Sequence, residues 1–380
     1  MRQMIVACAA LAALLLSVFG VAHAEPLRMV SQDLPALPGL KAFVLHSDRI
    51  GRDFQVVVHL PSATAFLPGQ KFPVIYALDS GYGLAGQTGL LLGNTGAMAP
   101  AIIVDVGYPA GQGAHRNDDL SHAKIIQGSA SFGGGGAAFE AFLAEDLRPF
   151  IEAQFPADPK RSVLFGHSLG GLFAARVFAH DPNAYAAYVI GSASVWADPE
   201  VAAAVAQAAP KAKDVRIYLT VGELEDAGGK PRMLNGFRAL AAALKGQPGV
   251  ALKTQLYAGE THLSYYPRLV TDGFPAVLPP LRPLNFHDLP LPPEMTKRYV
   301  GVYALPDGRT LTIRVPDLPP GAPPMLQAQV TGIVPVPLLQ NGKDRFYNPT
   351  SDIDATFDGA GLTMVADNAR MRVERVKSAP

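Results

Sequence analysis

The sequence predicts a doubly wound α/β domain with a mostly parallel sheet, followed by a small all-β domain. From about residue 40, short β-rich runs alternate with longer helical stretches. A proline-rich segment ends this alternation near residue 280, and short alternating runs separated by Gly, Asp, Asn and Pro follow it. Of the 380 residues, 49% are hydrophobic and 17% are charged, so the chain can bury a large core.

The expected strands of the first domain begin with KAFVLHS and FQVVVHL, which flank Ile50-Gly51-Arg52 and indicate a hairpin. Two near-continuous apolar runs, Phe72–Asp79 and Ala101–Tyr108, are typical of strands buried on both faces. Later strands are expected at RSVLFGH, YAAYVIGSAS, VRIYLTVGE and ALKTQLYAG.

Helices are expected between these strands. Apolar side chains from Phe139 to Phe155 recur at steps of one, three and four, which predicts a helix packed on the sheet. Pro149 should kink or divide that helix, because proline lacks the N–H that a helix interior needs. Further helices are expected after Ser168, after Asp198 and around Arg238–Leu244.

The domain boundary is predicted from FPAVLPPLRPLNFHDLPLPP, residues 274–293, which contains too much proline for a helix or a central strand. We therefore expect an α/β domain over residues 25–279, a linker over residues 280–294, and an all-β, barrel-like domain over residues 295–380.

The N-terminus has the pattern of a secretory signal. Arg2 precedes an apolar stretch that ends in Ala22-His23-Ala24, and signal peptidases cut after such a small-x-small sequence. We expect residues 1–24 to be cleaved and the protein to be periplasmic or secreted, without stable membrane insertion. The single cysteine, Cys8, would leave with the signal, so the mature chain has no disulfide or thiolate chemistry.

The 32 basic residues balance 32 acidic ones, which gives no electrostatic basis for binding nucleic acid.

A candidate nucleophile lies in GHSLGG, residues 166–171, where a Gly-x-Ser-x-Gly pattern is centred on Ser168 between a predicted strand and a predicted helix. A nucleophile elbow requires this context, because small neighbours permit a strained turn that lifts the serine above the sheet edge. The backbone N–H of Leu169, at the positive end of the helix, would face an oxyanion. A second donor is expected at Gly81 or a neighbour, and Tyr82 in the same loop is expected beside the substrate.

A serine needs a base to take its proton, and in this architecture a histidine follows the last strand of the domain. His262 has that position. His122 and His180 come well before the last strand, and His287 lies in the expected linker.

The acid of a triad should follow the preceding strand, because the chain order is serine, acid, histidine. VRIYLTVGELEDAGG offers Glu223, Glu225 and Asp226 within one turn. Glu225 is the first choice and Asp226 the second, and the sequence does not separate them.

Several motifs together resemble the putative-esterase family of α/β-hydrolases, which includes esterase D, feruloyl esterases and enterochelin-type siderophore esterases. The likeness covers most of Leu40–Pro279 and rests on GHSLGG, FPVIYALDSG, the Arg-x-x-Asp-Leu-Ser core in GYPAGQGAHRNDDLSHA, SASVWAD, VGELED and GETHLSYYP. The resemblance implies an α/β-hydrolase fold, with Ser168 and His262 in the catalytic positions. It also implies that Arg116, Asp119 and Trp196 lie around the substrate pocket.

The C-terminal region resembles the small β-barrel appended to many exported serine β-lactamase-like hydrolases. The likeness is carried by Tyr299-Val300-Gly301-x-Tyr303, LQAQVTG, PLL and DRFYNP. A substrate-shaping lid and a stabilising cap are both open interpretations of this module.

These observations predict an exported serine esterase that cleaves a small-molecule carboxylic ester through an acyl-enzyme intermediate, without a metal or organic cofactor. The alternatives are a siderophore (enterochelin-type) trilactone esterase, for which Arg116 and Arg232 are candidate cations, and an acyl-carbohydrate or feruloyl esterase. A non-enzymatic alternative is an inactive hydrolase frame that only binds. The sequence does not define the oligomeric state.

Overall fold

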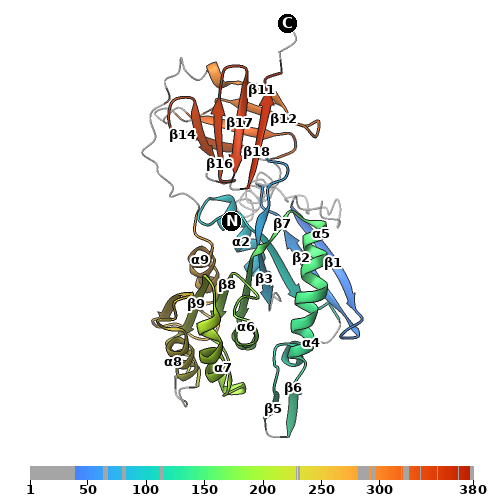
Figure 1. Ribbon diagram of the computed structural model, residues 1–380, viewed down its shortest axis with the longest axis vertical. Helices are drawn as coiled ribbons and strands as arrows, with labels where there is room; N and C mark the ends of the chain where they lie inside the picture. Colours follow the sequence, from blue (N-terminus) through green and yellow to red (C-terminus); the bar gives the residue numbers. More distant parts are fainter. Residues whose placement is uncertain are drawn as a thin grey trace, which may run out of the picture. The chain divides into compact units, whose positions relative to one another are not determined.

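The computed structural model (Figure 1) describes residues 39–62, 67–78, 83–111, 115–127, 129–227, 229, 232–280, 291, 297–317, 319, 325–333, 335–348, 350–366 and 368–376. The expected signal peptide, residues 1–24 with Cys8, lies outside this part of the chain. So do Gly81, Tyr82 and most of the expected linker.

The α/β part is built on an eight-stranded sheet of order β1-β2-β4-β3-β7-β8-β9-β10. Strands β1 and β2 form the expected antiparallel hairpin, and β2 also pairs antiparallel with β4. All neighbours from β4 to β10 are parallel. The strands are β1 (Leu40–Ser47), β2 (Arg52–His59), β3 (Phe72–Leu78), β4 (Ile102–Gly107), β7 (Ala157–His167), β8 (Ala187–Gly191), β9 (Val215–Gly222) and β10 (Val250–Tyr257).

Helices cover both faces of this sheet, because its strands are apolar on both sides. Along β3, Val74 and Tyr76 join one hydrophobic core, while Ile75 and Ala77 join the other. The first core is covered by α4 (Gly136–Ala141), η3 (Phe142–Leu147), α5 (Arg148–Gln154), α6 (Leu169–His180), α7 (Val201–Ala208) and α8 (Arg232–Leu244). The second is covered by α2 (Leu84–Asn94) and α9 (Tyr266–Val277). The predicted doubly wound α/β fold is therefore confirmed.

Shorter elements lie between these helices and strands: α3 (Arg116–Asp119), a hairpin of β5 (Lys124–Gln127) and β6 (Ala130–Gly133), η4 (Val195–Ala197) and η5 (Ala209–Lys211). Within the described ranges, no helix has both the length and the apolar character needed to cross a membrane.

The helix around Pro149 is divided as expected, but by a change of helix type. Residues 136–154 are helical throughout, with the π-helical η3 between α4 and α5. Pro149 is the second residue of α5, and its missing N–H removes one backbone hydrogen bond from this continuous helix. The helix nevertheless continues past the proline to Gln154.

The C-terminal part is an antiparallel meander in which each strand pairs with the next. A bridge between Tyr303 and Arg375 joins the first and last strands, so the sheet is nearly closed into a barrel (Figure 1). Its core includes the rings of Tyr299, Phe346 and Phe357. The strands are β11 (Gly301–Ala304), β12 (Thr310–Arg314), β13 (Leu326–Val330), β14 (Val336–Gln340), β15 (Arg345–Asn348), β16 (Ile353–Phe357), β17 (Gly361–Ala366) and β18 (Ala369–Glu374).

Strand β7 ends on a buried histidine, His167, directly before the candidate nucleophile. Its ring packs on those of His262 and Tyr266, with centroid distances of 4.5 Å and 5.3 Å. Burial, together with the nearby charges of His262 and Arg116, lowers the pKa of His167 to about 3. His167 is therefore neutral in the folded protein near neutral pH.

We expect the buried His167 to make stability depend on pH. An unfolded chain protonates a histidine near pH 6.5, whereas the folded protein holds His167 neutral down to about pH 3. Its contribution is therefore complete above about pH 6.5 and is lost as the pH falls, with a slope of up to about 1.4 kcal/mol per pH unit. Urea unfolding of H167Q between about pH 7 and pH 4.5 should show a smaller loss of stability than the wild type. If the unfolding free energies of the two proteins fell in parallel with pH, a buried, neutral His167 would be contradicted.

Candidate active site

Ser168 occupies a strained turn between β7 and α6. Its backbone has φ 62° and ψ −117°, a region that side-chain-bearing residues rarely adopt. A Cβ atom on Gly166 would lie 2.1 Å from the carbonyl oxygen of Gly170, so the turn requires glycine there. The N–H of Ser168 donates to the carbonyl of Gly191 at the end of β8, at 2.9 Å. The neighbouring strand thus holds the strained turn in place.

The turn places Ser168 at the N-terminus of α6, where the first backbone N–H groups lack intrahelical acceptors. The N–H of Leu169 belongs to this set, and the helix dipole adds partial positive charge there. The Ser168 hydroxyl oxygen lies 3.3 Å from that of Ser194, in the segment after β8. A partial negative charge that develops beside Ser168 would therefore meet hydrogen-bond donors.

Glu225 and His262 form a hydrogen-bonded pair at the ends of β9 and β10. The Nδ1–H of His262 donates to Oε2 of Glu225 at 2.6 Å. The other oxygen of Glu225 accepts from the N–H of Gly222 at 2.7 Å and from the hydroxyl of Ser192. The Glu225 side chain is only 1% exposed, so a buried carboxylate holds the ring of His262 through Nδ1, and Nε2 takes no part in this hydrogen bond.

Two residues that sequence analysis missed support this carboxylate. Ser192 has φ 41° and donates to Glu225, so its own oxygen must accept from the buried hydroxyl of Tyr265. Burial raises the pKa of Tyr265 well above its usual range, which keeps that hydroxyl protonated. The predicted strand YAAYVIGSAS included Gly-Ser-Ala-Ser, whereas β8 ends at Gly191; the visible signal was this run of small residues, which allows such a turn.

Asp226 and Glu223, the other two acidic candidates, have different contacts. Asp226 accepts from the N–H groups of Met233 and Leu234, in the first turn of α8, at 3.1 Å and 2.9 Å. Glu223 accepts from the N–H of Gly259 and is exposed. Asp226 therefore caps a helix, while Glu225 contacts the histidine.

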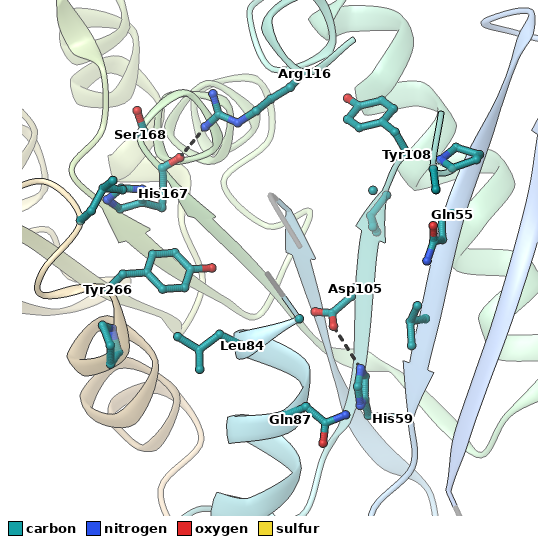
Figure 2. Close-up of a pocket in the computed structure, with 18 of the residues that line it drawn as sticks. Gln55, His59, Leu84, Gln87, Asp105, Tyr108, Arg116, His167, Ser168 and Tyr266 are labelled. Atoms are coloured by element: carbon teal, nitrogen blue, oxygen red, sulfur yellow. Dashed lines mark hydrogen bonds and ion pairs between the residues drawn. The ribbon is translucent and has the colours of Figure 1, made fainter. Parts of the chain in front are cut away.

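Ser168 and His262 line the same cavity, which has a volume of about 1320 Å³. Arg116, from α3, also lines it and donates from Nη2 to the carbonyl oxygen of His167 at 3.3 Å. Figure 2 shows Arg116 and Ser168 near one end of this cavity, with the rings of Tyr108 and Tyr266 on its walls. The cavity thus combines a cationic side chain with two aromatic ones.

Asp119 and Trp196 are not among the described residues that line the cavity. Asp119 is fully buried and accepts from Arg52 and from the hydroxyl of Tyr108, the latter at 2.8 Å. It therefore acts on the cavity through Tyr108, which it holds in place. Trp196 is partly exposed, and the guanidinium of Arg232 lies 5.9 Å from its ring centroid.

The opposite end of the cavity contains a buried polar pair that sequence analysis did not identify. Nε2 of His59 and Oδ2 of Asp105 are 3.0 Å apart, and both side chains lie within strands (Figure 2). Gly86 of α2 makes room for them, because a Cβ there would lie 2.2 Å from His59 Nε2. The cavity is therefore polar well away from Ser168.

Comparisons with known proteins agree with this architecture. The chain is similar to the ferri-bacillibactin esterase BesA of Bacillus subtilis, with 31% identity over 267 residues, which cover 64% of this chain and 91% of that protein. It also resembles a siderophore triacetylfusarinine C esterase of Aspergillus fumigatus, with 30% identity over 174 residues, 42% of this chain and 57% of that protein. Among solved structures, the BES protein from Bacillus cereus superposes with a TM-score of 0.58 and 27% identity, covering 66% of this chain and 99% of that one.

The model of the family described as Putative esterase matches residues 47–265. This range is more than half of the chain, and it contains Ser168, Glu225 and His262. The chain therefore belongs to the Putative esterase family of ester-hydrolysing enzymes.

Proposed function

We propose that this protein is an exported serine esterase that works through an acyl-enzyme intermediate, with Ser168, His262 and Glu225 as its triad. The main support for the proposal is the short hydrogen bond between His262 and the buried Glu225. His262 lines the same cavity as Ser168, which lies in a strained turn. Export is proposed from the signal-like residues 1–24.

In the proposed first step, Nε2 of His262 takes the hydroxyl proton of Ser168 while the serine oxygen attacks the ester carbonyl carbon. The resulting oxyanion is held by the N–H of Leu169, and Gly81 is the proposed second donor. The imidazolium then gives its proton to the leaving alcohol. Water, deprotonated by His262, attacks the acyl-serine, and collapse of this second intermediate releases the acid and restores Ser168.

Glu225 is proposed to hold His262 in the tautomer with the proton on Nδ1 and to stabilise the imidazolium that forms. Both of its oxygens accept hydrogen bonds, so it can act without being protonated itself. Tyr265 and Ser192 are positioning residues, because they act on the histidine only through Glu225.

For the substrate, we propose a siderophore ester. The two relatives described above are named a ferri-bacillibactin esterase and a siderophore triacetylfusarinine C esterase. The cavity is large, and Arg116 lines it, which suits a bulky substrate with anionic groups such as catecholates. Arg232, the other cation considered, contacts Trp196 and is not among the described lining residues. An acyl-carbohydrate or feruloyl ester is the second candidate, since the aromatic walls at Tyr108 and Tyr266 suit an aryl group.

S168A should lower kcat by at least about 10³-fold on every ester that the wild type hydrolyses, because no other group replaces the nucleophile. The panel is a trilactone siderophore, a feruloyl sugar and a short-chain aryl ester, followed by chromatography of the products. The wild type should prefer the trilactone. The matched control is S194A, which removes the neighbouring hydroxyl and should lose less than about tenfold. Turnover by a folded S168A protein would disprove the assignment of Ser168 as the nucleophile. If the wild type prefers the feruloyl sugar, only the siderophore assignment is disproved, and the triad is not affected.

E225Q and D226A should separate the two acids. E225Q should lower kcat by at least about 10²-fold, because an amide cannot stabilise the imidazolium of His262. D226A removes the cap of α8 and should lower the unfolding free energy by about 0.5–2 kcal/mol, with kcat nearly unchanged. Steady-state kinetics and urea unfolding measure both effects. A folded D226A protein as inactive as E225Q would reassign the triad acid.

A further inference from the structure

Three side chains of types that can bind metal ions come together from separate segments. None of them is among the described residues that line the cavity. His122 lies in the turn after α3, Glu140 in α4, and His180 is the last residue of α6. Oε2 of Glu140 is 2.9 Å from Nε2 of His122 and 2.9 Å from Nδ1 of His180. The three potential ligand atoms all lie within 4.8 Å of one another. Neither histidine has a part in the proposed ester hydrolysis.

The surrounding packing orients this cluster. The ring of His122 stacks on Phe173, with centroids 5.4 Å apart, and meets His180 edge-on at 5.1 Å. Gly136 leaves the space that the His122 ring occupies, because a Cβ there would lie 2.6 Å from its Nδ1. The side chains of His122, Glu140 and His180 are 11%, 23% and 49% exposed, so the cluster is fixed on its inner side and open to solvent on its outer side.

We propose that His122, Glu140 and His180 form a binding site for a divalent transition-metal ion of the zinc class. Two imidazole nitrogens and one carboxylate oxygen are a ligand set that Zn²⁺ takes, and a water molecule can fill the fourth position on the solvent side. Zinc–ligand bonds of about 2.0–2.1 Å place the ligand atoms of a tetrahedral site about 3.3 Å apart. The two 2.9 Å contacts therefore need to widen by only a few tenths of an ångström.

The charges of the cluster also suit a cation. Glu140 contributes a carboxylate, and the histidine nitrogens that face it, Nε2 of His122 and Nδ1 of His180, each lie 2.9 Å from its Oε2. A metal ion would replace the shared hydrogen bonds, and each histidine would then carry its proton on the nitrogen that does not bind metal. One anionic and two neutral ligands would leave a net positive charge on the site.

The position of the cluster indicates a structural role. His122 follows the short helix that carries Arg116, and His180 ends the helix that begins after Ser168. A metal ion bound to both histidines would link the segment that carries Arg116 to the C-terminal end of α6. Ser168 lies at the opposite, N-terminal end of that helix. The site takes no part in the chemistry proposed for Ser168, so the two proposals stand or fall separately.

The test uses the full chain without an affinity tag, treated with chelator and titrated with Zn²⁺ by isothermal calorimetry. The wild type should bind one ion per chain. E140Q and H180A should each weaken binding by at least about tenfold, because each removes one of three protein ligands. The matched control is H46A, because His46 also pairs with a carboxylate, Asp53 at 2.7 Å, but on the β1–β2 hairpin. H262A is a second control, since His262 and Glu225 offer zinc an alternative pair of ligands.

H46A and H262A should bind as the wild type does, and circular dichroism should show that E140Q and H180A remain folded. Co²⁺ added to the wild type should give the intense visible absorption of a four-coordinate site, a readout that needs no variant. The proposal is overturned if the wild type shows no saturable binding, if E140Q and H180A bind as the wild type does, or if binding disappears only in H262A.

Discussion

The constraint on which the site depends is the left-handed turn at Ser168, φ 62°, between the central strand β7 and helix α6. A strained residue persists only where its surroundings over-determine it. Here Gly166 admits the close approach of the helix, and the carbonyl of Gly191 binds the N–H of Ser168 from the next strand. Because β7 is covered by helices on both faces, the sheet can hold this turn rigidly, and Ser168 comes to lie at the first N–H groups of α6.

The second half of the site follows from parallel strands that end at one edge. The segments after β8, β9 and β10 contribute Ser192, Glu225 and His262, and the carboxylate of Glu225 contacts the other two. In an open parallel sheet, ligands bind beyond the carboxyl ends of the strands, and the Ser168 end of this cavity lies there. Its far end is polar at His59 and Asp105, which shows that the cavity is more than an apolar slot for an acyl chain.

Much of the fold could be predicted from the sequence, because buried parallel strands leave near-continuous apolar runs, as in Phe72–Leu78. Helices α2 and α9 were missed since α2 contains several glycines and α9 contains Pro275, which both weaken a helical pattern. Ser168 and His262 could be located by motif and chain order. Glu225 and Asp226 could not be separated, because adjacent residues in a turn differ only in where their side chains point. The buried pair His59 and Asp105 leaves no periodic signal, since each is a single polar residue in an apolar strand.

The proposed nucleophile is tested most directly by covalent labelling of the intact, folded enzyme with a fluorophosphonate. Digestion and peptide mass spectrometry then identify the labelled residue. An activated serine beside a histidine base attacks the phosphorus atom, displaces fluoride and keeps the phosphonyl group, whereas an ordinary serine does not react. We expect one adduct per chain, on the peptide that contains Ser168, with loss of esterase activity in proportion to labelling. An active enzyme that stays unlabelled, or that carries its adduct on another residue, would contradict it.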